Sequence, residues 1–150
     1  MTESSQDATP FLNVDLDLFS SGDLQPLIAA MGAKVEVLHV GRNKRIYVAH
    51  LELAGAHVTA AGRPGDPETV ILGFCKLIRA LKPAERAIWD AAKTRIFDIG
   101  IEAPEAGHRY QFAFSQKAMK AASEVNAQFA LSVYGPKPKV KARMKAPSAK

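Results

Sequence analysis

The segment Phe11–Val40 constrains the fold more than any other part of the chain, because two hydrophobic periodicities follow one another within it. In Phe11–Phe19 apolar and polar side chains alternate, and this period of two predicts a half-buried strand. The expected apolar face consists of Leu12, Val14, Leu16 and Leu18, and the expected polar face of Asn13, Asp15 and Asp17.

A short helix and a second strand are expected to follow. The apolar residues of the helix recur at the spacing of one helical face and are Leu24, Leu27, Ile28 and Met31. Gly32 can adopt the left-handed conformation that ends such a helix, and Lys34–Val40 then alternates as a strand. The segment therefore predicts a strand, a helix and a strand joined by short turns.

Length and composition predict one globular domain. A chain of 150 residues with 47% hydrophobic and 23% charged residues can bury a substantial core. No apolar run approaches the roughly 20 residues that span a bilayer, and the first ten residues lack the pattern of a signal peptide. The single cysteine excludes an internal disulfide and fits a reducing compartment. We therefore expect a cytoplasmic protein.

The basic character of the chain belongs to its C-terminal tail. Although the net charge is +5, residues 136–150 carry six positive charges and no acid, which leaves 14 basic and 15 acidic residues in 1–135. We expect residues 1–10 and 136–150 to be disordered around a domain spanning 11–135. Weak, sequence-independent binding of nucleic acid through the tail is an alternative function. Its candidate residues are Lys137, Lys139, Lys141, Arg143 and Lys145.

Further elements are expected along the chain. After a turn at Gly41–Lys44, Arg45–Leu53 should form a hairpin with the preceding strand. Asp66 and Pro67 are typical of a helix start, and a second short helix should span Ala84–Lys93. The apolar stripe of the first of these helices is Val70, Ile71, Phe74, Leu77, Ile78 and Leu81.

The last part of the chain predicts three more segments with strand periodicity and one helix. Arg95–Ala103 should be a strand, and Tyr110, Phe112 and Phe114 alternate as in a hairpin partner. Ser115 should cap a helix, and Gln128–Tyr134 should be the final strand. The apolar side of that helix is expected to be Ala118, Met119, Ala122 and Val125.

These segments together predict an α+β fold. We expect a single antiparallel or mixed sheet of five to six strands, with three to four helices packed on one face. The strand–helix–strand arrangement recurs near the C-terminus, where Asn126 and Ala127 stand in the places of Gly32 and Ala33. This recurrence indicates a possible internal pseudo-repeat.

The polar face of the sheet is the best candidate for a functional site. Its residues come from two strands and are Asn13, Asp15, Asp17, Asp98 and Glu102. If the two strands are neighbours, their carboxylates form an acidic surface for a basic partner. The alternatives are a solvated face neutralised by cross-strand Arg and Lys, or a cation or acid–base site that His39 or His50 joins. The spacing matches no metal motif, so we expect neither a metal nor a cofactor.

Other candidate sites are less favourable. Cys75 lies within a helix with nothing nearby in the sequence to lower its pKa, so we expect an inert thiol. His39 shares strand parity with Val35 and Val37, which predicts partial burial. The helix start at Asp66 would repel an anion, which excludes a phosphate site. We therefore assign no catalytic residue and consider an enzyme less plausible than a binding protein.

Two short motifs carry a family resemblance: RIFDIG at 95–100 and LSVYG at 131–135. With these, the chain resembles small uncharacterised bacterial α+β domains of unknown function. The resemblance implies no established activity. It implies an immunity or adaptor protein that works by binding another protein. We therefore expect a non-enzymatic protein-binding module, such as an immunity or accessory protein, and we expect it to bind through its polar sheet face or an exposed edge.

Overall fold

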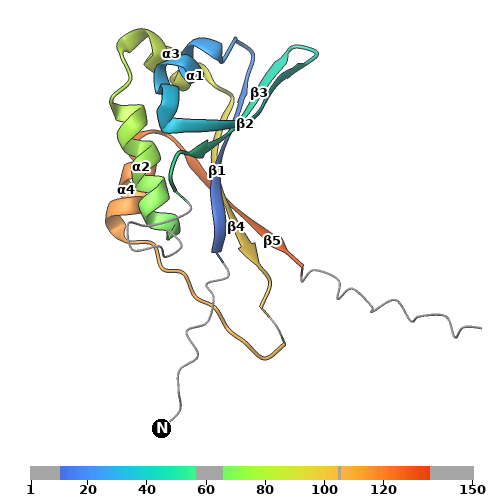
Figure 1. The fold of residues 1–150 in the computed structure, drawn as a ribbon. Helices are drawn as coiled ribbons and strands as arrows, with labels where there is room; N and C mark the ends of the chain where they lie inside the picture. The colour runs from blue at the N-terminus through green and yellow to red at the C-terminus, as the bar shows by residue number, and fades with distance from the viewer. Residues whose placement is uncertain (1–10, 57–65, 105, 136–150) are drawn as a thin grey trace, which may run out of the picture.

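The computed structural model describes residues 11–56, 66–104 and 106–135 (Figure 1). The segments 1–10 and 136–150, for which we predict disorder, lie outside the described residues, and so do residues 57–65 and 105. Within the described part of the chain, no helix is both long enough and apolar enough to cross a membrane.

The described residues form an α+β fold, as predicted, with a five-stranded mixed sheet and four α-helices. The strand order is β2-β3-β1-β4-β5, with antiparallel neighbours except for the parallel pair β4 and β5. The strands are β1 (Phe11–Ser20), β2 (Val35–Asn43), β3 (Ile46–Leu53), β4 (Thr94–Glu102) and β5 (Gln128–Tyr134).

Strand β1 lies at the centre of the sheet, and its alternation is largely as predicted. Val14, Leu16 and Leu18 are buried in the core. Leu12, which we predicted on the same face, is instead 45% exposed, and Phe11 is buried in its place. The reason is a register shift against β4 between Phe11 and Asn13, since a bulge reverses the side on which the preceding residues lie.

The first helix, α1 (Gln25–Met31), buries the predicted stripe. Its N-terminal turn is closed by Asp23, whose carboxylate accepts a hydrogen bond from the Gln25 amide at 2.9 Å. Gly32 ends the helix at a positive φ of +56°, as predicted, but its ψ of −136° lies outside the left-handed helical region, in a conformation that glycine adopts most readily. A 3-10 turn, η1 (Gly32–Lys34), then leads into β2.

The hairpin of β2 and β3 is confirmed, but β2 runs further than predicted. It continues to Asn43, and the chain reverses at Lys44, which has φ +56°. The predicted turn at Gly41–Lys44 was therefore too wide. A register shift between Val37 and His39 also moves His39 out of the parity on which its burial was predicted, and His39 is exposed.

Two helices precede β4. Helix α2 (Pro67–Arg79) starts as predicted, since the Asp66 carboxylate accepts from the Thr69 amide at 2.9 Å. Helix α3 (Pro83–Ala91) contributes Trp89, which is fully buried. In the core these helices meet the buried face of β1. The contributing side chains of α2 are Val70, Ile71, Phe74, Cys75 and Ile78.

Helix α4 (Gln116–Glu124) is capped by Ser115 and followed by Asn126 at φ +55°, as predicted. The prediction that Met119 belongs to its buried side was wrong, because Met119 is 57% exposed. Ala121 lies on the core side instead.

The segment Tyr110–Phe114 is not a strand. The predicted hairpin partner has no place beside β4, because β1 pairs with one edge of β4 and β5 with the other. Phe112 and Phe114 instead pack at the border of the core, and the Phe114 ring stacks on that of Phe129 with centroids 5.6 Å apart.

Two side chains connect the ends of α3 and α4. The Trp89 indole N–H donates to the Val125 carbonyl at 2.8 Å inside the core. The Arg95 guanidinium donates to the carbonyls of Trp89, Asp90 and Ala92 at 2.6–3.2 Å, and to that of Asn126 at 3.0 Å. Arg95 therefore satisfies carbonyls at two helix ends from one strand position.

We predict that Arg95→Ala lowers the free energy of unfolding by about 2 kcal/mol, because charge-assisted hydrogen bonds to several carbonyls are lost at once. Arg95→Lys should recover only part of this, since an ammonium cannot reproduce the planar set of donors. Urea denaturation measures both. Arg86→Ala is the control, because its exposed pair with Asp90 should contribute less than about 0.5 kcal/mol. Equal losses for Arg95 and Arg86 would contradict the bridging role.

Candidate functional site

The sheet register places carboxylates from four neighbouring strands in one line. Asp15 of β1 lies opposite Glu52 of β3 on one side and opposite Asp98 of β4 on the other. Glu52 in turn lies opposite Glu36 of β2. We call Glu36, Glu52, Asp15 and Asp98 the acidic row. Neighbouring strands are about 4.8 Å apart, so the row brings like charges close together.

Four of the five sequence-predicted residues occupy three neighbouring positions on this face. Asp15 and Asp98 belong to the acidic row itself. Asp17 lies one position along β1, opposite His50, and Asn13 lies opposite Gly100 on the other side of the row. Glu102 lies at the end of β4, opposite Tyr134. The structure therefore brings Asn13, Asp15, Asp17 and Asp98 together and leaves Glu102 at the margin.

Sequence reasoning missed Glu36 and Glu52. Both stand on strands that were predicted, and Glu52 alternates with Leu51, which is fully buried. Their parity alone identifies them as residues of the polar face. Their position opposite Asp15 depends on the hairpin register, which the sequence does not supply.

Asn13 bridges two carboxylates of the row. Its amide donates to Asp15 Oδ1 at 2.9 Å and to Glu52 Oε1 at 3.1 Å. Gly100 leaves room for this arrangement, because a Cβ at that position would lie 2.5 Å from Asn13 Oδ1. Asn13 thus supplies hydrogen bonds to the row without supplying a positive charge.

The other carboxylates of the face have individual partners. The Ser132 hydroxyl lies 2.7 and 2.9 Å from the two carboxylate oxygens of Asp98. Asp17 Oδ1 lies 2.5 Å from His50 Nδ1, and the His50 ring lies 5.8 Å from that of His39. The partner of Asp98 is therefore neutral, and that of Asp17 is charged only when His50 is protonated.

The pKa of Asp15 is raised by partial burial and by the neighbouring carboxylates. The pKa rises from 3.8 to about 6, and partial burial is the largest cause. The charges of Glu52 and Asp17 follow, and then a hydrogen bond with Glu52 and the charge of Asp98. The charged groups that raise the pKa of Asp15 are Glu52, Asp17 and Asp98, and all three are acids.

The described residues contain no group of three or more His, Cys, Asp or Glu arranged to hold a metal ion. Cys75 is buried, and burial raises the pKa of its thiol to about 11. The thiol therefore stays protonated at neutral pH, as its helical position predicted, and is a poor nucleophile.

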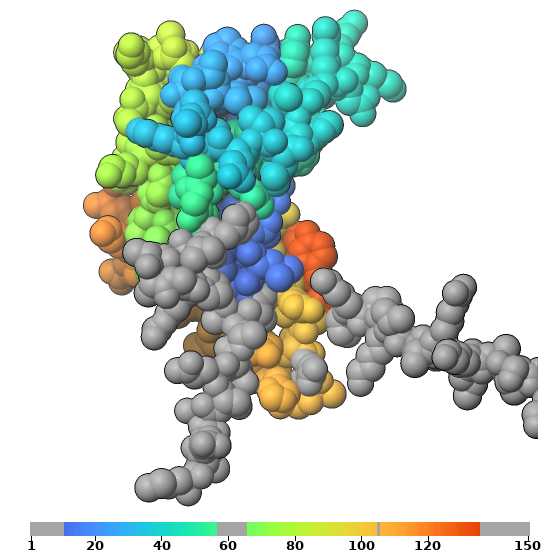
Figure 2. Space-filling view, viewed as in Figure 1, coloured from blue at the N-terminus to red at the C-terminus, as the bar shows by residue number. Residues whose placement is uncertain are grey.

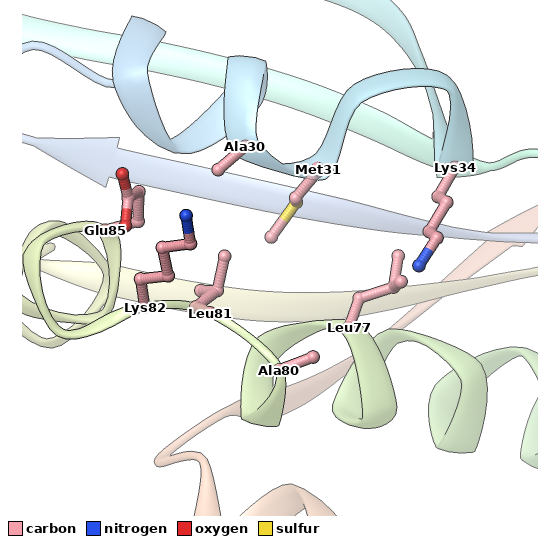
Figure 3. Close-up of a pocket in the computed structure, with 8 residues that line it drawn as sticks. All are labelled: Ala30, Met31, Lys34, Leu77, Ala80, Leu81, Lys82 and Glu85. Atoms are coloured by element: carbon pink, nitrogen blue, oxygen red, sulfur yellow. The ribbon is translucent and has the colours of Figure 1, made fainter.

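A shallow pocket of about 310 Å³ lies away from the acidic row, between α1, the end of α2 and the start of α3. Figure 3 shows Met31 and Leu81 projecting toward each other across it, with Lys34 and Lys82 at its sides. None of the residues that line it is a serine, cysteine or histidine, so the described lining offers no nucleophile of those types. The full lining is Ala30, Met31, Lys34, Leu77, Ala80, Leu81, Lys82 and Glu85.

Comparison of the chain with known proteins finds no matching family model, no matching curated protein and no matching solved structure. The acidic row is consequently interpreted from its own geometry and charge.

We predict that Asp15→Asn stabilises the protein at pH 8 and has little effect at pH 4. The folded pKa of Asp15 lies above its unfolded value of 3.8, so the carboxylate progressively destabilises the fold as pH rises from about 4 through 6. Solvent screening limits the expected gain to the order of 1 kcal/mol. Asparagine keeps the oxygen that accepts from Asn13.

Urea unfolding at both pH values measures the difference. Asp90→Asn, in the exposed ion pair of α3, is the matched control and should give no gain at pH 8. A gain of equal size at pH 4 and pH 8 would contradict electrostatic crowding at Asp15.

Proposed function

We propose that this chain is a non-enzymatic bacterial protein-binding module, of the immunity or accessory type, that acts in the cytoplasm. In this proposal the acidic row docks a basic segment of another protein. The observation that supports it best is the alignment of the acidic row, in which Asp15 lies between Glu52 and Asp98 and Glu52 lies opposite Glu36. Burial and neighbouring carboxylates raise the pKa of Asp15, so its ionised form destabilises the fold.

A basic partner would relieve that destabilisation. Lysine or arginine side chains laid along the row would meet Glu36, Asp15 and Asp98, while the buried Glu52 would add to the negative potential between them. Their charges would lower the pKa of Asp15 and convert repulsion into attraction. A single-sign surface also accelerates the encounter with an oppositely charged partner and disfavours acidic ones.

The proposal requires that the polar face remain open. We propose that the helices cover the opposite face, and two observations support this. Alternate residues of β1, such as Leu16 and Leu18, share a core with helix residues such as Leu27 and Phe74. By contrast, Asp15 and Asp17 are only partly buried.

We also propose that the chain contains an internal pseudo-repeat. The endings of α1 and α4 support it, since each helix is followed by a residue at positive φ.

Binding of nucleic acid through the C-terminal tail is the rival function. Its residues, Lys137 to Lys145, lie outside the described residues. Such binding would depend on counterion release from phosphates and would not involve the acidic row. Removal of residues 136–150 therefore separates the two functions.

We predict that a protein partner captured from host lysate by the full-length chain is lost with the double variant Asp15→Asn and Asp98→Asn. Loss of two negative charges from the row should weaken binding about tenfold or more, since desolvated charge pairs contribute strongly. Quantitative affinity capture at low and high salt measures this. Recovery should fall as salt rises, because screening weakens the attraction.

Three controls make the result specific to the row. Asp90→Asn removes an acid on α3, outside the row, and should leave capture unchanged. A 1–135 truncation and nuclease treatment test the tail, and both should leave the partner bound. A partner retained equally by the double variant would disprove docking on the acidic row, and nuclease-sensitive capture that requires the tail would favour the rival.

A further inference from the structure

Strand β5 forms one edge of the sheet (Figure 1), and its C-terminal end is visible in orange-red at the surface of the molecule (Figure 2). Its sequence, QFALSVY, contains no charged residue, proline or glycine. Edge strands of monomeric proteins normally carry such residues, because these discourage pairing with another strand. This edge lacks that protection.

The apolar side chains of β5 continue the core face of the sheet but are largely exposed, although the Phe129 ring is partly covered by that of Phe114. Phe129 and Leu131 lie beside Phe97 and Ile99 of β4, which are 0% and 1% exposed. On β5 the exposed fractions rise to 40% for Phe129, 64% for Leu131 and 61% for Val133. An apolar row that is buried on β4 is therefore exposed on the next strand.

The backbone of β5 presents its free groups at the same three residues. Tyr134 accepts a hydrogen bond from the Ala103 amide at 2.7 Å, so its backbone groups point toward β4. Backbone groups alternate sides along a strand, and those of Phe129, Leu131 and Val133 therefore point outward.

We propose that β5 pairs with β5 of a second copy of this chain, antiparallel and with Leu131 on the two-fold axis. In this register Leu131 pairs with Leu131 of the partner subunit, and Phe129 pairs with Val133 of the partner subunit. Each outward-pointing residue then forms a hydrogen-bonded pair, and each apolar side chain meets another. A charge-free strand is also the kind that two identical copies can pair without repulsion, and a two-fold contact is closed.

Strand β2, at the opposite edge of the sheet, is less suited to pairing with a second copy of the chain. Strand β2 also exposes apolar residues, including Val37 and Leu38, but it carries Glu36 and Arg42 and has a register shift between Val37 and His39. Charges and bulges are the features that oppose edge pairing. The second copy is therefore assigned to β5 and not to β2.

A pair of cysteine variants tests both the contact and its register. In the proposed dimer the two Leu131 Cα atoms are about 5.5 Å apart, within the roughly 4.4–6.8 Å range of a disulfide. The two Val133 Cα atoms are offset by about 13 Å along the strands. We therefore expect Leu131→Cys to crosslink into a dimer under mild oxidation at least about tenfold more than Val133→Cys.

These two positions are a matched pair, since both are apolar, similarly exposed and on the same strand. The native Cys75 is buried and its thiol stays protonated, so it contributes little background on a non-reducing gel. Equal crosslinking at 131 and 133 would disprove the register, and absence of crosslinking at both would disprove the contact.

Sedimentation of the full-length chain without cysteine variants tests the same contact. At about 100 µM, where a dimer with a Kd of about 10 µM is mostly assembled, the unmodified protein should be dimeric. Leu131→Lys should be monomeric, because it places two like charges opposite each other on the axis. Val37→Lys, on the other edge, should remain dimeric. A monomeric unmodified protein, or loss of the dimer with Val37→Lys alone, would overturn the proposal.

Discussion

The central position of β1 is the constraint on which the rest of the structure depends. Because β3 and β4 occupy both of its edges, each residue from Asp15 to Phe19 has a partner on either side. On the core face this arrangement fully buries Leu16 and Leu18. On the polar face the same geometry places Asp15 between Glu52 and Asp98. The alternation that builds the core thus also gathers the carboxylates.

Local chemistry made most elements predictable from the sequence. The Asp66 cap, the positive φ of Gly32 and Asn126, and the apolar stripe of α1 each depend on residues within one turn. The errors arose where tertiary pairing decides the outcome. Leu12 is exposed because of a bulge against β4, and Tyr110–Phe114 is not a strand because β5 occupies the edge of β4 it would need.

In the candidate site too, some residues could be predicted from the sequence, and the alignment of others depends on tertiary pairing. Asp15 and Asp98 could be placed on one polar face by parity, since each alternates with buried residues of its own strand. Glu36 and Glu52 have the same parity on β2 and β3, but their alignment with Asp15 is a property of the register. A one-residue slip of the hairpin would turn both side chains to the other face. The charge density around Asp15 was therefore beyond sequence reasoning.

The proposed docking face and the proposed dimer are geometrically compatible. A two-fold axis at Leu131 that joins two antiparallel strands runs perpendicular to the sheet, so both acidic rows lie on the same face. The row within each subunit reaches β5 at Ala130, which pairs with Asp98. In the dimer Ala130 would lie opposite Ser132 of the partner subunit, so small neutral residues would separate the two rows. An extended basic partner long enough to cross this gap could engage both rows, and the second contact would then form at the high effective concentration of an intramolecular event.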